Sequence, residues 1–194
     1  MKTLRYPFDE KSVRALKAGD AVSISGRIYT GRDKFHKWFA EGRPLPVDFR
    51  GGALYHCGPV VVADSAAGGW RVVAAGPTTS VRENPYEPDF IAKTGVRIVI
   101  GKGGMDGRTL DAMREHGCVY VQAVGGAAAV SAASVRRVAG VSLLDEFGAA
   151  EAVWHFDVEG FCGVVAMDAH GRSLFDGVRA VSARRLGELV GSAR

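Results

Sequence analysis

Apolar residues in the first part of the chain recur with two different periods. Within residues 21–28 they alternate with smaller or polar neighbours, which is the two-residue period of a half-buried strand. Phe35, Trp38 and Phe39 instead follow the three- and four-residue spacing of one helix face, and a glycine and a proline soon provide a stop. These patterns predict a strand at 21–28 and a short helix within residues 32–42.

From residue 52 onward, apolar runs of strand length alternate with amphipathic runs of helix length. The predicted elements are a strand, a Gly-Pro turn and a second strand over 52–63, a surface turn at 64–69, a strand at 70–75, a helix at 87–95, a strand at 96–100, a helix at 108–117, a strand at 118–124 and a helix at 127–138. Because strands that alternate with helices normally pair in parallel, residues 70–138 predict a parallel part of a sheet.

The C-terminal part changes character. Residues 152–175 read as consecutive strands with short turns, and residues 177–191 as a helix. We find no internal repeat and no linker long enough to separate domains, and 194 residues suffice to bury roughly 70% of the unfolded surface. The sequence therefore predicts one α/β domain with a mixed sheet over residues 1–194.

The composition is that of a folded globular protein, with 47% hydrophobic and 24% charged residues. The formal charge of +4 comes from 25 basic and 21 acidic residues, with basic side chains gathered near the C-terminal end. No aromatic residues interleave with them, which favours a solvated helix face over a nucleic-acid surface. The longest stretch of low polarity, residues 123–135, is shorter than the roughly 20 residues needed to cross a bilayer.

The cysteines indicate the compartment and the kind of site to expect. Cys57, Cys118 and Cys162 lie far apart and form no CxxC or His-Cys pair, so a self-contained zinc or iron–sulfur site is not expected. An odd number of cysteines argues against a secreted disulfide framework, and the N-terminal residues offer no signal-peptide stretch. We expect a cytoplasmic protein without membrane or nucleic-acid partners.

The segment GPTTSVR, residues 76–82, follows a strand-like run and carries more chemistry than a turn requires. Gly76 and Pro77 supply the dihedral freedom and the fixed φ of a turn. Three consecutive hydroxyls that begin at Thr78, and Arg82 four residues later, have no such purpose. These polar residues are therefore candidates for a site.

The segment GKGGMDG, residues 101–107, is a second glycine-rich turn after a strand. Asp106 stands where the dinucleotide fingerprint needs its third glycine, and Lys102 is not followed by the Ser or Thr of a Walker loop. Two interpretations remain. The first is a tight turn with a solvated lysine; the second is an anion site in which Lys102, backbone N–H groups and a helix N-terminus bind a carboxylate.

Three cations, Arg32, Arg82 and Lys102, lie near predicted strand ends and suit a small diacid. Two such groups can hold both ends of a short dicarboxylate and so fix its middle carbons for chemistry. For Arg32 the alternative is a solvated side chain beside a helix capped by Asp33. His56, between apolar residues, is more typical of a hydrogen-bonded core histidine than of a metal ligand.

The ordered motifs resemble the β subunit of class I (iron–sulfur) fumarate hydratase and L-tartrate dehydratase, which matches the C-terminal domain of single-chain class I fumarases. The resemblance covers nearly the whole chain, and GPTTSVR followed by GKGGM some twenty residues later is its most specific part. The segments that carry it are LKAGDAVSISGRIYTGRDKFHK, GALYHCGPVV, GPTTSVR, GKGGM, VGGAAA and FCGVVAMDAHGRSL.

The resemblance implies a swivelling β/β/α fold and a hydro-lyase that reversibly hydrates a C4 dicarboxylate, fumarate or malate ahead of L-tartrate. It implies activity only with a partner α subunit, in an α2β2 heteromer, that carries a [4Fe–4S] cluster acting as a Lewis acid on the departing hydroxyl. Matched by motif, Arg32, Arg82 and Lys102 bind the substrate carboxylates. The resemblance also implies that Thr78 is the catalytic base that removes the proton next to a carboxylate, with Lys102 also in the catalytic set.

Two residues depart from the family pattern. Glu83 follows Arg82 where the family usually has methionine, and Phe35 precedes the helix histidine where alanine is common. Glu83 either alters substrate preference or points away from the site. It favours the alternative that the chain is a stand-alone dicarboxylate-binding or regulatory module that has lost catalysis.

Overall fold

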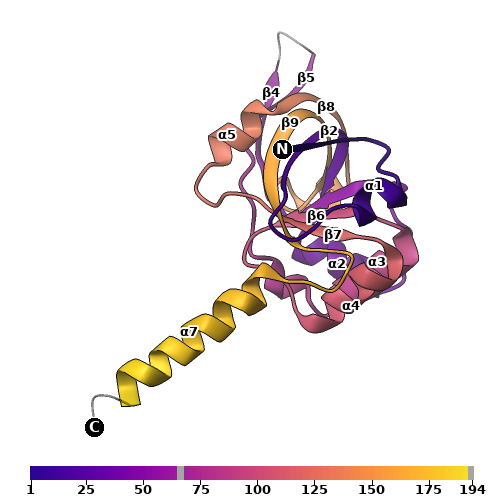
Figure 1. Ribbon diagram of the computed structural model, residues 1–194. Coiled ribbons are helices and arrows are strands. Elements are labelled where there is room, and N and C mark those ends of the chain that lie inside the picture. Colours follow the sequence, from indigo (N-terminus) through magenta and orange to yellow (C-terminus); the bar gives the residue numbers. More distant parts are fainter. Residues whose placement is uncertain (65–67, 192–194) are drawn as a thin grey trace.

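The computed structural model describes residues 1–64 and 68–191 (Figure 1). The strands are β1 (Lys2–Arg5), β2 (Ala21–Thr30), β3 (Ala53–Tyr55), β4 (Val60–Asp64), β5 (Gly69–Ala74), β6 (Ile98–Gly101), β7 (Val119–Gln122), β8 (Val135–Ser142) and β9 (Val153–Met167). The helices are α1 (Glu10–Arg14), α2 (Asp33–Ala40), α3 (Glu87–Thr94), α4 (Gly107–His116), α5 (Ala128–Ala133), α6 (Leu144–Phe147) and α7 (Leu174–Gly191), with a 3-10 turn η1 (Ser80–Glu83).

A mixed sheet forms the centre of the molecule. Its strands follow the order β1-β2-β3-β6-β7-β9-β8, and β2 additionally pairs with β9, so the sheet partly closes on itself. Neighbours among β2, β3, β6 and β7 are parallel, whereas β9 runs antiparallel to β2, β7 and β8. The predicted α/β class with a mixed sheet is confirmed.

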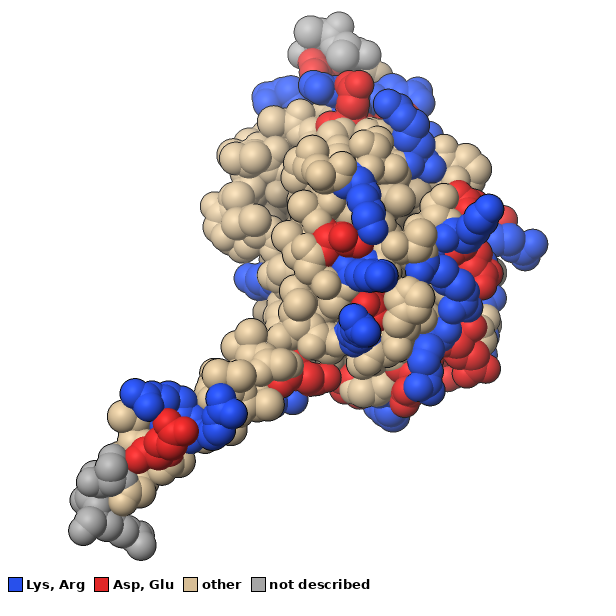
Figure 2. Space-filling view, in the orientation of Figure 1, with Lys and Arg blue, Asp and Glu red and all other residues tan. Residues whose placement is uncertain are grey.

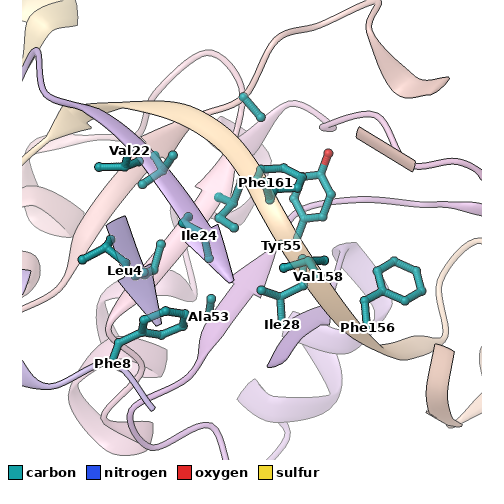
Figure 3. Close-up of a cluster of buried hydrophobic side chains, with 14 of the residues drawn as sticks. Leu4, Phe8, Val22, Ile24, Ile28, Ala53, Tyr55, Phe156, Val158 and Phe161 are labelled. Atoms are coloured by element: carbon teal, nitrogen blue, oxygen red, sulfur yellow. The ribbon is translucent and has the colours of Figure 1, made fainter. Parts of the chain in front are cut away.

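Parallel strands β3, β6 and β7 are buried on both faces, which explains their nearly continuous apolar sequences. Alternate residues point to two separate clusters: Tyr55 and Ile100 belong to the cluster enclosed by the curved sheet, and Leu54 and Val99 to the cluster beneath the helices. Figure 3 shows part of the enclosed cluster, to which β1, β2, β3 and β9 contribute side chains. The second cluster holds the buried aromatic residues of α2 and α3, Phe35 and Phe90.

Helices α2, α3 and α4 lie together on one side of the sheet (Figure 1). Phe35 is fully buried, as the apolar spacing of the α2 sequence predicts. Helix α3 ends at Thr94, and the next residue, Gly95, caps it in the left-handed conformation with φ 69° that favours glycine at a helix end. The predicted helices at 32–42 and 87–95 are therefore confirmed.

Three predictions about the arrangement of elements are wrong. The helix predicted at 127–138 ends at Ala133, and Val135 begins strand β8, whose arginines pair across the sheet with β9 (Arg137 with Asp157 at 2.6 Å). The consecutive strands predicted at 152–175 are mostly one long strand, β9. The third concerns β5, which lies outside the parallel sheet.

Strands β4 and β5 form a separate two-stranded antiparallel ribbon. Side chains such as Val60 and Val73 are half exposed on it, so the apolar run before residue 76 is not the buried strand that its sequence suggests. The turn predicted at 64–69 lies partly outside the residues that the structure describes. The ribbon brings the chain back to the sheet at residue 75.

Helix α7 extends away from the rest of the molecule (Figures 1 and 2). None of its described side chains is buried, although Phe175 at its start packs against Tyr120 with ring centroids 6.3 Å apart. The helix predicted at 177–191 is thus confirmed and begins three residues earlier. Over the parts of the chain that the structure describes, no helix is both long and apolar enough to cross a membrane.

Candidate functional site

The GPTTSVR segment crosses the ends of two neighbouring parallel strands. The Thr78 backbone N–H donates to the carbonyl of His56, just beyond β3, at 2.7 Å, and the Lys102 N–H, just beyond β6, donates to the Thr78 carbonyl at 3.2 Å. The Ser80 N–H in turn donates to the Lys102 carbonyl at 3.0 Å. Thr78 is therefore held between the carboxyl ends of β3 and β6, where α/β sheets commonly place their ligands.

Arg82 lies directly against the threonine. Its Nη2 donates to Thr78 Oγ1 at 3.0 Å, which the four-residue spacing allows because η1 turns the chain back on itself. The same Nη2 lies 3.0 Å from Asp33 Oδ2. A guanidinium beside a hydroxyl favours the ionised oxygen over the neutral one, so Thr78 has an adjacent cation to stabilise an alkoxide.

Arg32 stands immediately before α2 and is not the solvated side chain of the alternative interpretation. Its Nη2 lies 3.2 Å from Glu151 Oε1 and 3.9 Å from Asp33 Oδ2, and its Nη1 donates to the Ala150 carbonyl at 3.3 Å. A Cβ on Gly58 would lie 2.2 Å from Arg32 Nη1, so the glycine of HCGP leaves room for this guanidinium. Asp33 does not cap α2.

Lys102 is half-buried beside the GG turn, where a Cβ on Gly125 would lie 3.6 Å from its side chain. Within residues 1–64 and 68–191, its ammonium makes no ion pair. The helix terminus expected to assist it is already occupied, because Asp106 Oδ1 accepts from the Thr109 N–H and so caps α4. An anion here would rely on Lys102 itself.

The four predicted site residues thus form one chain of contacts. Thr78 touches Arg82 through its side chain and Lys102 through its backbone, and Asp33 links Arg82 to Arg32. Three cations linked to one another through Thr78 and Asp33 suit a ligand with two carboxylates. Asp33 contacts both arginines in this state, so a bound carboxylate would compete with it.

Directly behind these residues lies a buried polar network that sequence reasoning largely missed. Its members are all fully buried: His36, His56, Ser80, Glu83, Glu87 and Tyr120. Glu87 Oε2 lies 2.8 Å from His36 Nε2 and 3.2 Å from His56 Nε2. His36 Nδ1 is 3.0 Å from the Arg32 carbonyl, and His56 Nδ1 is 2.9 Å from Ser80 Oγ.

Burial and mutual charge set the protonation of the network. Burial would raise the pKa of Glu87, but the charges and hydrogen bonds of His56 and His36 outweigh it and lower this pKa to about 2. Burial works against the charged form of His36, yet Glu87 and Glu83 raise the pKa of this imidazole. Burial lowers the pKa of His56 below its ordinary value. Burial also raises the pKa of Glu83 to about 7.

Comparison with known proteins decides the family. A family model described as "Fumarase C-terminus" matches residues 3–178 of this chain. The chain belongs to the fumarase C-terminal family. A relative from Methanocaldococcus jannaschii, named for the β subunit of L(+)-tartrate dehydratase, is 41% identical over 97% of this chain and 100% of its own length.

Two further relatives differ in how much of their length this chain covers. The β subunit of L(+)-tartrate dehydratase from Escherichia coli is 32% identical over 97% of this chain and 94% of its own length. A protein from Geobacillus stearothermophilus named for class I fumarate hydratase is 50% identical over 96% of this chain. The chain spans only 36% of that longer relative.

The cysteines do not supply a cluster site within this family member. Cys57 and Cys118 are buried in different apolar clusters, and Cys162 is exposed on β9. Burial raises the pKa of the Cys57 thiol to about 12, which disfavours the thiolate that iron binds. Among the described residues, the one group of three or more potential ligands is His36, His56 and Glu87, a set without sulfur.

The contacts within the His36, His56 and Glu87 group are hydrogen bonds between its own members. Both imidazole Nε2 atoms lie within hydrogen-bond distance of the same carboxylate oxygen, so Glu87 itself joins the two histidines. The interpretation of His56 as a hydrogen-bonded core histidine is confirmed. Glu83, which the sequence left open, is fully buried with its Oε2 3.3 Å from His36 Nδ1, and so points away from the site.

Sequence reasoning missed Glu87 and Glu151 as neighbours of the site. Glu87 is in the first turn of α3, where an acidic residue has an ordinary explanation in the helix dipole. Glu151 lies 119 positions from Arg32, and only the fold brings them together. No local sequence pattern points to either carboxylate as a neighbour of the site, because basic residues outnumber acidic ones in this chain.

Glu83→Met should make the protein more stable at high pH. The folded chain keeps the Glu83 proton up to about pH 7, whereas in the unfolded chain this carboxyl titrates near 4.5, so wild-type stability falls as the pH rises through this window. Methionine has no such loss. In urea unfolding, we expect the free energy of unfolding of the variant to exceed that of wild type by up to about 3 kcal/mol at pH 8. At pH 5 this difference should be smaller by about 2 kcal/mol.

Glu83→Gln is the matched control, because it removes the charge and keeps the shape. The difference in free energy of unfolding between this variant and wild type should change with pH in the same direction as for Glu83→Met. An unpaired buried amide would lower the stability of the variant equally at every pH. A difference between wild type and both variants that does not change between pH 5 and pH 8 would show that Glu83 does not titrate in this window.

Proposed function

We propose that this chain is the β subunit of an iron–sulfur hydro-lyase that reversibly adds water to, or removes it from, a C4 dicarboxylate. Fumarate and malate are the first candidates and L-tartrate the next. The observation that carries the proposal is the Thr78 hydroxyl against Arg82, with Lys102 bonded to the Thr78 backbone and Arg32 linked through Asp33. The names of the relatives support the same reaction class.

In this proposal each site residue has a separate role. Arg32, Arg82 and Lys102 bind the substrate carboxylates, and Thr78 removes the proton from the carbon next to one of them. A neutral threonine hydroxyl is a weak base, so the reaction needs the alkoxide to be stabilised. The Arg82 Nη2 at 3.0 Å supplies a cation for this purpose.

Among the described residues, the site offers cations and a hydroxyl but no ligand set suited to a cluster. We propose that a partner α subunit carries a [4Fe–4S] cluster and completes the site in an α2β2 complex. Relatives named as β subunits support a partner chain. With three cysteines and no disulfide framework, we also propose a cytoplasmic location.

A stand-alone binding module remains the competing interpretation, but its main support is weakened. Glu83 favoured it as an acidic group beside an anion site, and this carboxyl faces His36 in the interior instead. Calorimetry of the isolated chain with malate, fumarate and tartrate separates the two. Weak binding is expected of half a site, and tight binding without a partner would favour the module.

The decisive experiment is anaerobic co-expression with the candidate α chain, followed by assay of the cluster-loaded complex. Malate, fumarate and both tartrate isomers are tested in turn, with the α chain alone and this chain alone as controls. We expect turnover of at least one diacid by the complex and none by either chain. A cluster-loaded complex that turns over none of them would overturn the enzyme assignment.

The isolated chain should self-associate, because the side of the site expected to face the α subunit is apolar. Val124, just before the GG turn at Lys102, is 65% exposed, Val130 on α5 is 74% exposed, and Val81 next to Arg82 is 52% exposed. Figure 2 shows few charged side chains on the side of the molecule that carries α5. Such a patch on a soluble protein commonly marks an interface.

Sedimentation of the isolated chain and of the complex tests this expectation. The isolated chain should form concentration-dependent oligomers, and Val124→Ser with Val130→Ser should reduce them while also weakening binding to the α chain. A matched pair on the far ribbon, Val60→Ser with Val73→Ser, should change neither as much. An isolated chain that stays monomeric at all concentrations would make an obligate partner hard to defend.

A further inference from the structure

The buried polar network joins the separate segments that carry the candidate site. His36 reaches the Arg32 carbonyl with Nδ1 at 3.0 Å. The carbonyl of His56 accepts from the Thr78 N–H, and Ser80, which contacts the His56 ring, donates its own N–H to the Lys102 carbonyl. Each segment is therefore one bond from a network member.

One proton arrangement accounts for the contacts between these side chains. A backbone carbonyl only accepts, so His36 Nδ1 carries a proton towards Arg32, and the ionised Glu87 accepts from His36 Nε2. His36 is then an imidazolium. Glu87 also accepts from His56 Nε2, which leaves His56 Nδ1 to accept from the Ser80 hydroxyl.

The chain of donors ends at Tyr120. Its hydroxyl lies 2.9 Å from Ser80 Oγ and donates to it, because the Ser80 proton is already directed at His56. The raised pKa of His36 and the lowered pKa of His56 agree with this arrangement. A Cβ on Gly101 would lie 2.0 Å from Ser80 Oγ, so the first glycine of GKGGM gives the network its space.

We propose that Glu87 is a positioning residue, which, through its two histidines, holds Arg32 and the Thr78–Ser80 turn in a fixed arrangement for substrate. The inference rests on the proposed function for the identity of the bound substrate. It adds the residue that keeps Arg32 and the Thr78–Ser80 turn correctly placed relative to each other. Glu87 touches neither Arg32 nor Thr78 and is fully buried, so its effect must pass through the histidines.

Several charged groups surround this carboxylate and must be considered with it. His36 and His56 contact it directly, and Glu83 lies 3.3 Å from the far nitrogen of His36. The charge of Asp33 acts on both Glu83 and His56. Removing the Glu87 charge leaves the His36 imidazolium without its partner at 2.8 Å. His36 then loses a proton or its contact with the Arg32 carbonyl.

Glu87→Gln in the reconstituted complex is the first test, with Ile91→Ala as its control. Ile91 is fully buried one turn further along α3 and has no polar contact with the network, so its truncation lowers stability without removing a charge. We expect Glu87→Gln to lower kcat/KM about 100-fold per folded complex, with a raised KM, because small misplacements of a site are costly. Ile91→Ala should stay within about threefold of wild type.

Hydrogen exchange on the full-length chain gives a second reading that does not depend on activity. In Glu87→Gln the Thr78 and Lys102 amides should exchange at least tenfold faster than in wild type, and nitrogen NMR should show His36 becoming neutral. In Ile91→Ala any increase should be spread over the domain. Equal exchange at Thr78 and Lys102 in the two variants would overturn the inference, as would equal kinetics.

Metal analysis completes the test. One equivalent of zinc in the wild-type chain that Glu87→Gln lacks would overturn the inference, because the His-Glu-His group would then be a metal site.

If the complex turns over no diacid but exchange at Thr78 and Lys102 responds as expected, the proposed function fails while the positioning network stands. If the complex is active and both variants behave alike, the network fails and the proposed function stands.

Discussion

Thr78→Ala in the reconstituted complex should lower kcat by about 100-fold or more with little change in KM. The hydroxyl acts on a proton that moves only in the transition state, so its loss leaves the ground-state contacts to the carboxylates in place. The backbone contacts that hold residue 78 between β3 and β6 do not involve the side chain, and alanine preserves them. Steady-state kinetics on malate and fumarate give both constants.

Thr79→Ala is the matched control for this prediction. Thr79 is the neighbouring threonine of the same turn, but it is exposed and bridges to Lys102 only through its backbone. Its loss should leave kcat near wild type, and Thr78→Ser should retain more activity than Thr78→Ala. A Thr78→Ala complex that keeps a nearly normal kcat would reduce the threonine to part of a turn and assign the base to the α subunit.

Arg32→Ala and Lys102→Ala should instead raise KM, each by roughly 10- to 150-fold. These cations make charge-assisted bonds to the carboxylates already in the ground state, and each such bond contributes about 1.5–3 kcal/mol. Arg32→Ala should have the larger effect. Its removal also frees the Glu151 carboxylate, now 3.2 Å from the guanidinium, to repel an anionic substrate.

The double variant Arg32→Ala with Glu151→Gln tests the origin of that difference. Removing the freed negative charge should recover part of the KM loss, while Glu151→Gln alone should change KM much less. Lys93→Ala is the control for lysine removal in general, because Lys93 is exposed on α3 and pairs with Asp89 at 2.9 Å. Unchanged KM in both Arg32→Ala and Lys102→Ala would remove these residues from substrate binding.

Elements with strong local patterns could be predicted from the sequence. The spacing of the aromatic residues marks α2, and Gly95 marks the end of α3, because both signals act between residues close in the chain. The helix predicted at 127–138 was wrong beyond residue 133, because local signals there do not distinguish a helix from a strand. Val135 and the residues after it have the composition of either element, and pairing with β9 decided in favour of a strand.

The candidate residues themselves were also readable from the sequence. Thr78 and Arg82 are four residues apart, and η1 alone brings them into contact, so local geometry sufficed. Lys102 meets Thr78 only through the fold, because β5, the strand before the first turn, lies in the separate ribbon and backbone bonds bring the turn to the ends of β3 and β6. Each of these candidates was recognised by its residue type and its place in a motif, and both can be read directly from the sequence.

The environment of those residues was decided by the tertiary structure alone. Whether Glu83 faces substrate or the interior, and whether Arg32 is solvated or paired with Glu151, depends on side chains that come from distant segments. The charge state of buried carboxylates such as Glu87 depends on desolvation and on which imidazoles lie within 3.2 Å. The sequence by itself determined which chemical groups this protein carries, whereas burial and long-range contact determined their partners and charges, because these arise only once the chain has closed on itself.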